Sequence, residues 1–152
     1  MHEISVVYTR PVFNEMPKVC NSGDADRIIR EAIGGVCLDY QEHFWCLYLN
    51  NANRVLGYCE ISKGDATGTL VNIPQIFAVA LRVSAKAIIV IHNHPSGTLK
   101  PSKSDKGISQ RIDAAATLLG MALLDSLIIT SESYYSFSDA GLILQPNRTL
   151  PF

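Results

Sequence analysis

The sequence has little net charge, no long apolar run and no closely spaced cysteine pair. Its formal net charge is −1, so no overall positive field favours binding to DNA or to an anionic membrane. No apolar run approaches the roughly 20 residues that a membrane-spanning helix needs, and the N-terminal stretch MHEISVVYTR does not resemble a signal peptide. We therefore expect a cytoplasmic protein without a membrane partner.

The cysteines are far apart in the sequence, at Cys20, Cys37, Cys46 and Cys59. Structural zinc fingers need closely spaced ligand pairs, so this spacing argues against a zinc site built from cysteine. Reduced, buried thiols are the expectation for an intracellular protein. With 47% hydrophobic and 18% charged residues, the composition is that of a globular protein, and the length of 152 residues predicts one domain over residues 1–152.

Alternating strand and helix patterns predict an α/β fold. The expected strands cover residues 4–9, 43–50, 54–64, 86–94, 122–130 and 133–141. The expected helices cover about 24–36, 74–85 and 103–119. Ser22 or Asp24 is expected to cap the first helix, and Ser102 or Ser104 the third. Because the run KAIIVIHNH is typical of a strand covered on both faces, a mixed sheet with helices on its two faces is predicted.

Two of the four histidines lie one residue apart in the stretch IIVIHNHPSGTLKPSKSD, residues 88–105. Side chains i and i+2 of a strand project to the same side, so His92 and His94 can direct two imidazoles toward one point. Pro95 ends the strand because it lacks a backbone donor, and Asp105 in the first turn of the next helix can add a carboxylate oxygen. Such a set leaves the fourth position of a tetrahedral zinc open for water, as a catalytic site requires.

Each member of this group also has a simpler interpretation. Either histidine could be hydrogen-bonded at a strand end, without a metal. Ser102 could serve only as a helix cap, and Asp105 could be an acid favoured by the helix dipole. The spacing of the whole group, rather than any one residue, favours a metal site.

The pattern His92-x-His94-Pro95 followed by Ser102-x-x-Asp105 is similar to the JAMM (MPN+) metalloprotease motif. The fuller strings HNHPSG and PSKSD resemble the RadC branch of that superfamily, long labelled DNA repair proteins, and the similarity extends over about residues 25–143. It implies a three-layer α/β/α sandwich with a mixed central sheet, the JAB/MPN (cytidine deaminase-like) fold. Long RadC members carry an N-terminal helix-hairpin-helix-like region, so we expect this chain to be a short form without it.

The resemblance also implies a set of site residues. One zinc ion per chain would be held by His92, His94 and Asp105. Ser102 would stabilise the oxyanion of the tetrahedral intermediate, and Glu42 would act on the zinc water as general acid and base. Glu60 on the next expected strand is a competing candidate for that role, and Glu31 on the preceding helix is a poor one.

Three functions are compatible with this resemblance. The first is a zinc-dependent hydrolase of the JAMM type, a metallopeptidase or isopeptidase with an unknown peptide or protein substrate. The second is a DNA repair or recombination accessory protein without peptidase activity, although the net charge gives direct nucleic-acid binding little support. The third is a catalytically silent scaffold, which the presence of every matched metal ligand disfavours. An exposed hairpin edge would also allow a homodimer.

Overall fold

A five-stranded mixed sheet lies at the centre of the computed structural model, within the described residues 1–3, 5, 7–64 and 70–143. Its strands are β1 (His43–Leu49), β2 (Val55–Lys63), β3 (Ala87–Asn93), β4 (Ala122–Ile129) and β5 (Tyr134–Ser136). The helices are α1 (Ser22–Ile33), α2 (Ile73–Arg82) and α3 (Lys103–Leu118), after a 3-10 turn at Phe13–Glu15. None of the helices in the described parts of the chain is long and apolar enough to cross a membrane.

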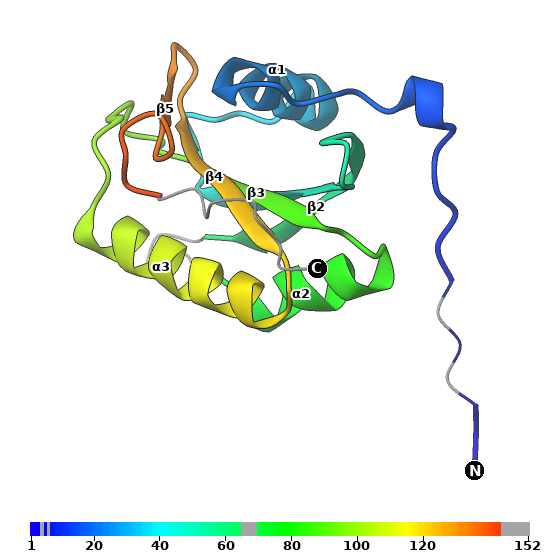
Figure 1. Cartoon of the computed structure of the whole chain (residues 1–152). Helices are drawn as coiled ribbons and strands as arrows, with labels where there is room; N and C mark the ends of the chain where they lie inside the picture. Colours follow the sequence, from blue (N-terminus) through cyan, green and yellow to red (C-terminus); the bar gives the residue numbers. More distant parts are fainter. Residues whose placement is uncertain (4, 6, 65–69, 144–152) are drawn as a thin grey trace.

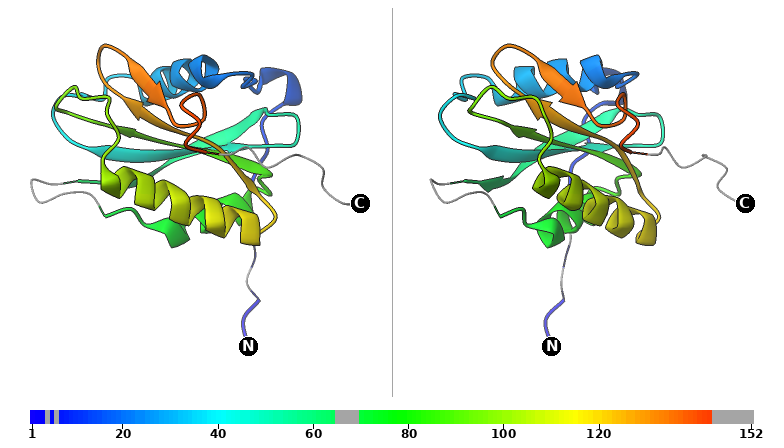
Figure 2. Two further views of the ribbon diagram at one scale, coloured as in Figure 1. Left: turned by 60° about the vertical axis from the view of Figure 1, so that its left-hand side comes forward. Right: turned by 90° about the vertical axis from the view of Figure 1, so that its left-hand side faces the viewer.

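The strand order is β2-β1-β3-β4-β5, and β3 lies in the middle of the sheet. β3 pairs antiparallel with β1 and parallel with β4, and all of its residues are buried. The side views show α1 on one face of the sheet and α2 with α3 on the other (Figure 1, Figure 2). This arrangement confirms the predicted α/β sandwich and explains why the β3 sequence is a nearly continuous apolar run.

The register of the central strands assigns each side chain to one face. Phe44 of β1 pairs with His92 of β3, and Phe44 belongs to the core that α2 and α3 cover. Trp45 pairs with Ile91, and both belong to the core that α1 covers. Because strand side chains alternate, His92 and Ile91 project to opposite faces of the sheet. His92 therefore lies on the face of α2 and α3.

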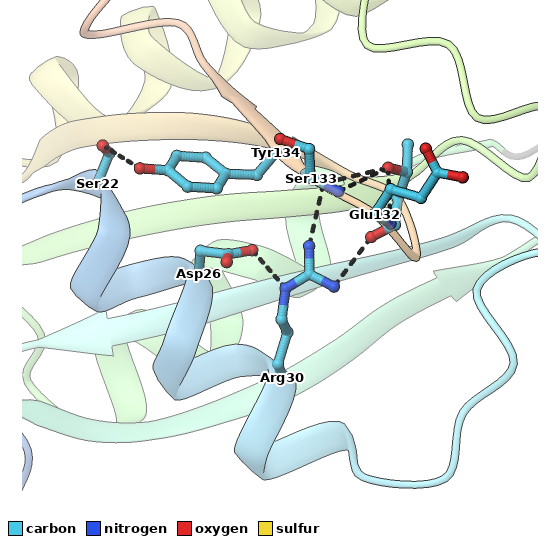
Figure 3. Close-up of polar contacts among 7 residues, drawn as sticks. Ser22, Asp26, Arg30, Glu132, Ser133 and Tyr134 are labelled. Atoms are coloured by element: carbon cyan, nitrogen blue, oxygen red, sulfur yellow. Dashed lines mark hydrogen bonds and ion pairs between the residues drawn. The ribbon is translucent and has the colours of Figure 1, made fainter.

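α1 is tied to the turn between β4 and β5 by Arg30 (Figure 3). Its guanidinium donates to the carbonyl oxygens of Thr130 and Ser133 at 2.9 and 3.0 Å. The Asp26 carboxylate accepts from the Arg30 Nε atom at 2.7 Å, which holds the guanidinium in this orientation. This fork of charge-assisted hydrogen bonds adds a contact from α1 to a turn that is otherwise held by its own backbone and by the Thr130 hydroxyl.

Replacing Arg30 with alanine is expected to lower the free energy of unfolding by about 1–2 kcal/mol, since hydrogen bonds to a charged, half-buried group are lost. Urea denaturation measures the change. Arg27→Ala is the matched control, because its ion pair with Glu31 joins side chains that are 55% and 67% exposed and should contribute at most about 0.5 kcal/mol. Equal losses in the two variants would show that the Arg30 fork adds nothing.

Two predicted elements differ from the structure. The cap of α1 is Asn21, whose side chain accepts from the Asp24 N–H at 3.0 Å, and neither Ser22 nor Asp24 caps the helix. Asp24 instead accepts from the Cys20 N–H, so it completes the cap from within the helix. The predicted strand over residues 4–9 is also wrong for its described positions, because residues 5 and 7–9 form no strand; residues 4 and 6 lie outside the described residues.

Other boundaries shift by a few residues. α1 ends at Ile33, three residues early, because Gly34 and Gly35 break the helix and Gly35 has a positive φ of 55°. The last strand covers only Tyr134–Ser136 instead of 133–141. It stops there because the carboxylate of buried Asp125 accepts from the Ser136 hydroxyl and the Ser138 N–H, which turns the chain away from the sheet.

The cysteines are all free thiols, but they are not all buried as predicted. Cys46 is buried and Cys59 is half-buried, whereas Cys20 and Cys37 are exposed. Burial raises the pKa of the Cys46 thiol, so this group is protonated at neutral pH. The two exposed thiols lie at the ends of the α1 region, where the sequence pattern gave no clear strand or helix face to bury them.

Candidate metal centre

The end of β3 brings the two predicted imidazoles together. The His94 N–H donates to the Ile129 carbonyl at 3.1 Å, so the extended pairing with β4 continues one residue beyond the strand. As a result, the Nε2 atoms of His92 and His94 lie 3.0 Å apart. Two nitrogen lone pairs at this distance repel each other unless a proton or a cation lies between them.

The third predicted ligand comes from the start of α3. Ser102 caps the helix, as predicted, and its Oγ accepts from the Asp105 N–H at 3.0 Å. The Asp105 carboxylate accepts from the Ser102 N–H at 2.7 Å in return, which completes a capping box. Within this geometry its two oxygens lie 3.3 Å from the His92 Nε2 atom and 3.5 Å from the His94 Nε2 atom. A local capping rule thus turns the carboxylate toward the histidines.

These three residues form a possible metal-binding triad. Among the described residues, one ligand atom from each of His92, His94 and Asp105 lies within 4.8 Å of the others. Two imidazole nitrogens and one carboxylate oxygen are a donor set that suits zinc and leaves a coordination position free. The residues therefore fit the ion that the sequence resemblance implies.

The environment keeps the carboxylate ionised, which is the form that binds a cation. Burial raises the pKa of Asp105, but hydrogen bonds from His92, His94 and Ser102 outweigh it and hold this pKa well below its usual range. The contact with Asp105 in turn raises the pKa of His94 against the opposing effect of burial, and nearby Glu42 adds to the rise.

Sequence reasoning missed two residues that orient the histidines. The Nδ1 atom of His94 lies 2.7 Å from the Thr98 carbonyl oxygen. Because a carbonyl only accepts, Nδ1 carries a proton, so Nε2 presents its lone pair to the triad in the neutral ring and can donate to Asp105 only in the protonated ring. His92 is instead oriented by packing, since its ring stacks on Phe44 with a centroid distance of 5.9 Å. Its buried Nδ1 atom has no hydrogen-bond partner within the described residues.

A cavity of about 320 Å³ lies over the triad and brings the other predicted site residues to the same place. Glu42 reaches it from the segment before β1, and Ser102 from the cap of α3. The remaining walls mix apolar side chains with hydroxyls and are formed by Phe44, Val71, Val90, Ser104, Ile108, Ser109 and Ser126. A pocket of this size with a few converging polar groups is typical of a small binding site.

Glu60 and Glu31, the other candidates for the general acid and base, do not line this cavity. Glu60 pairs with Trp45 in the sheet, so it is on the α1 face, opposite the triad. Its carboxylate lies 3.2 Å from the His43 Nδ1 atom, and the His43 ring stacks on Trp45. Glu31 is exposed on α1, where it pairs with Arg27. Of the three glutamates considered, Glu42 is the one that lines the cavity.

Comparison with known sequences agrees with this geometry. The family described as RadC-like JAB domain matches residues 19–142. A UPF0758 protein of Flavobacterium johnsoniae is 41% identical over 128 residues, which are 84% of this chain and 55% of that protein. UPF0758 proteins of Porphyromonas gingivalis and Chlorobaculum parvum are 42% and 39% identical over 104 and 103 residues, which are 68% of this chain and 46% of each relative.

The chain thus spans about half the length of the curated relatives it matches. The matched region contains the sheet, the three helices and every residue of the triad and the cavity. These findings confirm the resemblance seen in the sequence. The chain belongs to the RadC-like JAB domain family.

Proposed function

We propose that this protein is a zinc-dependent hydrolase of the JAMM type that cleaves a peptide or isopeptide bond. The observation that carries the proposal is the convergence of two histidines and an aspartate within 4.8 Å, on a cavity that also contains a free-standing glutamate and a serine. Membership of the RadC-like JAB domain family supports it. A zinc ion held by His92, His94 and Asp105 would supply a Lewis acid beside the scissile carbonyl.

Glu42 is the group that moves protons in this proposal. Its carboxylate lines the cavity next to the triad and makes no hydrogen bond to another side chain within the described residues. It can therefore take a proton from the attacking water and deliver it to the leaving amine. A carboxylate already engaged in an ion pair, such as Glu60 with His43, is less suited to this role.

Ser102 is suited to stabilise the oxyanion. Its Oγ atom accepts from the Asp105 N–H at 3.0 Å, and its hydroxyl hydrogen, which can also donate to the Asp105 carboxylate, can turn to donate to a substrate oxygen in the cavity. Its place at the helix cap also puts it at the positive end of the α3 dipole. A fixed donor at this position would favour the charge that develops on the substrate oxygen during attack.

A proteomic comparison tests the proposed reaction class. Cells that express the wild-type chain are compared with cells that express Glu42→Gln, and protein termini and isopeptide linkages are quantified in both. We expect specific new termini or lost linkages with the wild type alone, because the variant keeps the metal ligands but lacks the proton acceptor. Identical profiles, with both proteins folded and loaded with zinc, would argue against a hydrolase of peptide bonds.

Direct nucleic-acid binding is a second candidate, favoured by one observation. Lys100, Lys103 and Lys106 lie at and just before the start of α3, beside the cavity, and form no ion pair within the described parts of the chain. All three lysines are exposed. Three such lysines could contact phosphates, although the whole chain has a net charge of −1.

A salt titration of duplex and single-stranded DNA binding distinguishes this candidate. With at most three phosphate contacts, the slope of log K against log salt should be no steeper than about −3, and binding should be in the non-specific range of about 10⁻⁴ M or weaker. Fluorescence anisotropy at several salt concentrations gives the slope. A slope near −6 with submicromolar affinity would show a nucleic-acid interface that is larger than these three lysines can form.

A further inference from the structure

We propose that Asn93 is a positioning residue that holds the segment of Glu42 in place, so that the strand that supplies the histidines also sets the position of the glutamate. The inference rests on the proposed role of Glu42. Asn93 is the last residue of β3 and lies between the two histidines in the sequence. Its side chain acts on the backbone on either side of Glu42, and not on the side chains of the triad.

The alternation of side chains along β3 explains how one strand can supply the histidines and also hold the Glu42 segment. Ile91 belongs to the core under α1, and Asn93, two residues later, projects to that same face. His92, between them, projects to the opposite face and into the cavity. The strand thus presents its ligands on one side and a fully buried amide on the other.

The amide of Asn93 bonds to three backbone groups that flank Glu42. Its Nδ2 atom donates to the carbonyl oxygens of Leu38 at 2.8 Å and Gln41 at 2.7 Å. Its Oδ1 atom accepts from the His43 N–H at 2.7 Å. Both amide hydrogens and the oxygen are therefore used, and among the side chains asparagine matches this pattern of two donors and one acceptor at this length.

The segment before β1 needs such an anchor because it has no regular secondary structure. Residues 34–42 form turns and bends between α1 and β1. The Glu42 carbonyl accepts from the Gly64 N–H at 2.8 Å, and the Gln41 side chain bonds to the Gly64 carbonyl. These contacts hold the backbone. Because no hydrogen bond within the described residues holds the Glu42 carboxylate itself, its position depends on that backbone.

The test uses the full chain with zinc and with cobalt(II) as probes. Asn93→Ala removes all three hydrogen bonds. Asn93→Ser buries no charge and leaves a short hydroxyl that cannot make all three bonds, and it serves if the alanine variant does not fold. Asn21→Ala is the matched control, since it also removes an asparagine that bonds to the backbone, at the cap of α1. Glu42→Gln provides the reference for a disturbed glutamate.

Three readouts are measured for each variant: zinc affinity, the visible absorption spectrum of the cobalt-substituted protein, and hydrogen exchange of residues 38–43. The cobalt bands respond to the solvent ligand and its hydrogen-bond partners, so a displaced carboxylate changes them even where the protein ligands are intact. For Asn93→Ala we expect zinc affinity within about threefold of the wild type, because the ligands lie on the other face of the strand. We expect at least half of the spectral change seen in Glu42→Gln, with faster exchange in residues 38–43.

The outcomes separate this inference from the proposed function. If Glu42→Gln changes the cobalt spectrum and Asn93→Ala does not, the positioning role is overturned and the role of Glu42 stands. If Asn93→Ala lowers zinc affinity tenfold or more, Asn93 acts on the ligands and the inference is again overturned. If Glu42→Gln leaves the spectrum unchanged, Glu42 does not act beside the metal, and the proposed mechanism falls together with this inference. Asn21→Ala should retain the wild-type spectrum.

Discussion

Replacement of Asp105 or His92 with alanine is expected to weaken zinc binding by on the order of 10²–10³-fold. Binding free energies of about 10–16 kcal/mol are shared among the four ligands of structural zinc sites, so each ligand accounts for roughly 2.5–4 kcal/mol, and about 1.4 kcal/mol corresponds to tenfold in affinity. Both residues are among the three that converge here. Zinc content after dialysis, followed by competition with a chromophoric chelator, measures the loss.

Asp105 needs a more careful variant, because its carboxylate also belongs to the capping box of α3. Asp105→Asn keeps an oxygen for the Ser102 N–H but offers a poor ligand to zinc, so it separates metal binding from helix capping. We expect this variant to fold as the wild type does without metal. At a zinc concentration a few times the wild-type Kd, zinc should raise the melting temperature of the wild type and leave that of Asp105→Asn nearly unchanged, because the stabilisation depends on the ratio of the ligand concentration to its Kd. Wild-type zinc affinity in both Asp105→Asn and His92→Ala would rule out the triad as the zinc site.

Glu42→Gln is expected to lower the turnover number for a cleaved peptide by about 10²–10⁴-fold while the zinc affinity changes by less than about threefold. The amide keeps the size of the side chain but cannot accept the proton of the attacking water, and general acid–base groups contribute rate factors of this size. The metal ligands are left intact. The measurement is steady-state hydrolysis of a substrate found in the proteomic comparison, together with zinc affinity of the same preparation.

Glu60→Gln is the matched control for this prediction. It makes the same chemical change one strand away, on the opposite face of the sheet, where Glu60 pairs with His43. We expect its turnover number to stay within about threefold of the wild type. A large loss in Glu60→Gln with little effect in Glu42→Gln would reverse the assignment. Equal and large losses in both would indicate a general disturbance of the sheet.

Some of the site could be predicted from sequence because local rules determine it. The i, i+2 spacing of His92 and His94 puts both rings on one side of an extended chain, whatever surrounds the strand. The Ser102-x-x-Asp105 step defines a helix start, and the observed capping box follows directly from it. Pro74 lies in the first turn of α2, as its missing N–H allows. Each of these features depends on residues within one turn or one strand.

Other features could not be predicted because they depend on pairing between distant segments. The sequence left open whether Glu42 or Glu60 faces the site, since one residue of register decides which face a strand side chain occupies. The cap of α1 was missed because Asn21, Ser22 and Asp24 are all good capping residues, and the rest of the structure decides among them. The Ser22 hydroxyl, for example, is hydrogen-bonded to the Tyr134 hydroxyl at 3.1 Å and is not used as a cap (Figure 3).

The sequence by itself determined the class of fold, the donor set of the triad and the helix start that carries its aspartate, because short-range periodicity and capping chemistry set them. The tertiary structure alone decided that the three ligand groups lie within 4.8 Å, that Glu42 shares their cavity and that Asn93 connects the Glu42 segment to β3. The last two of these arrangements join residues about 50 positions apart, and the triad joins Asp105 to histidines 11 and 13 positions before it. Their geometry follows from the order and register of the strands in the sheet, which no local pattern specifies.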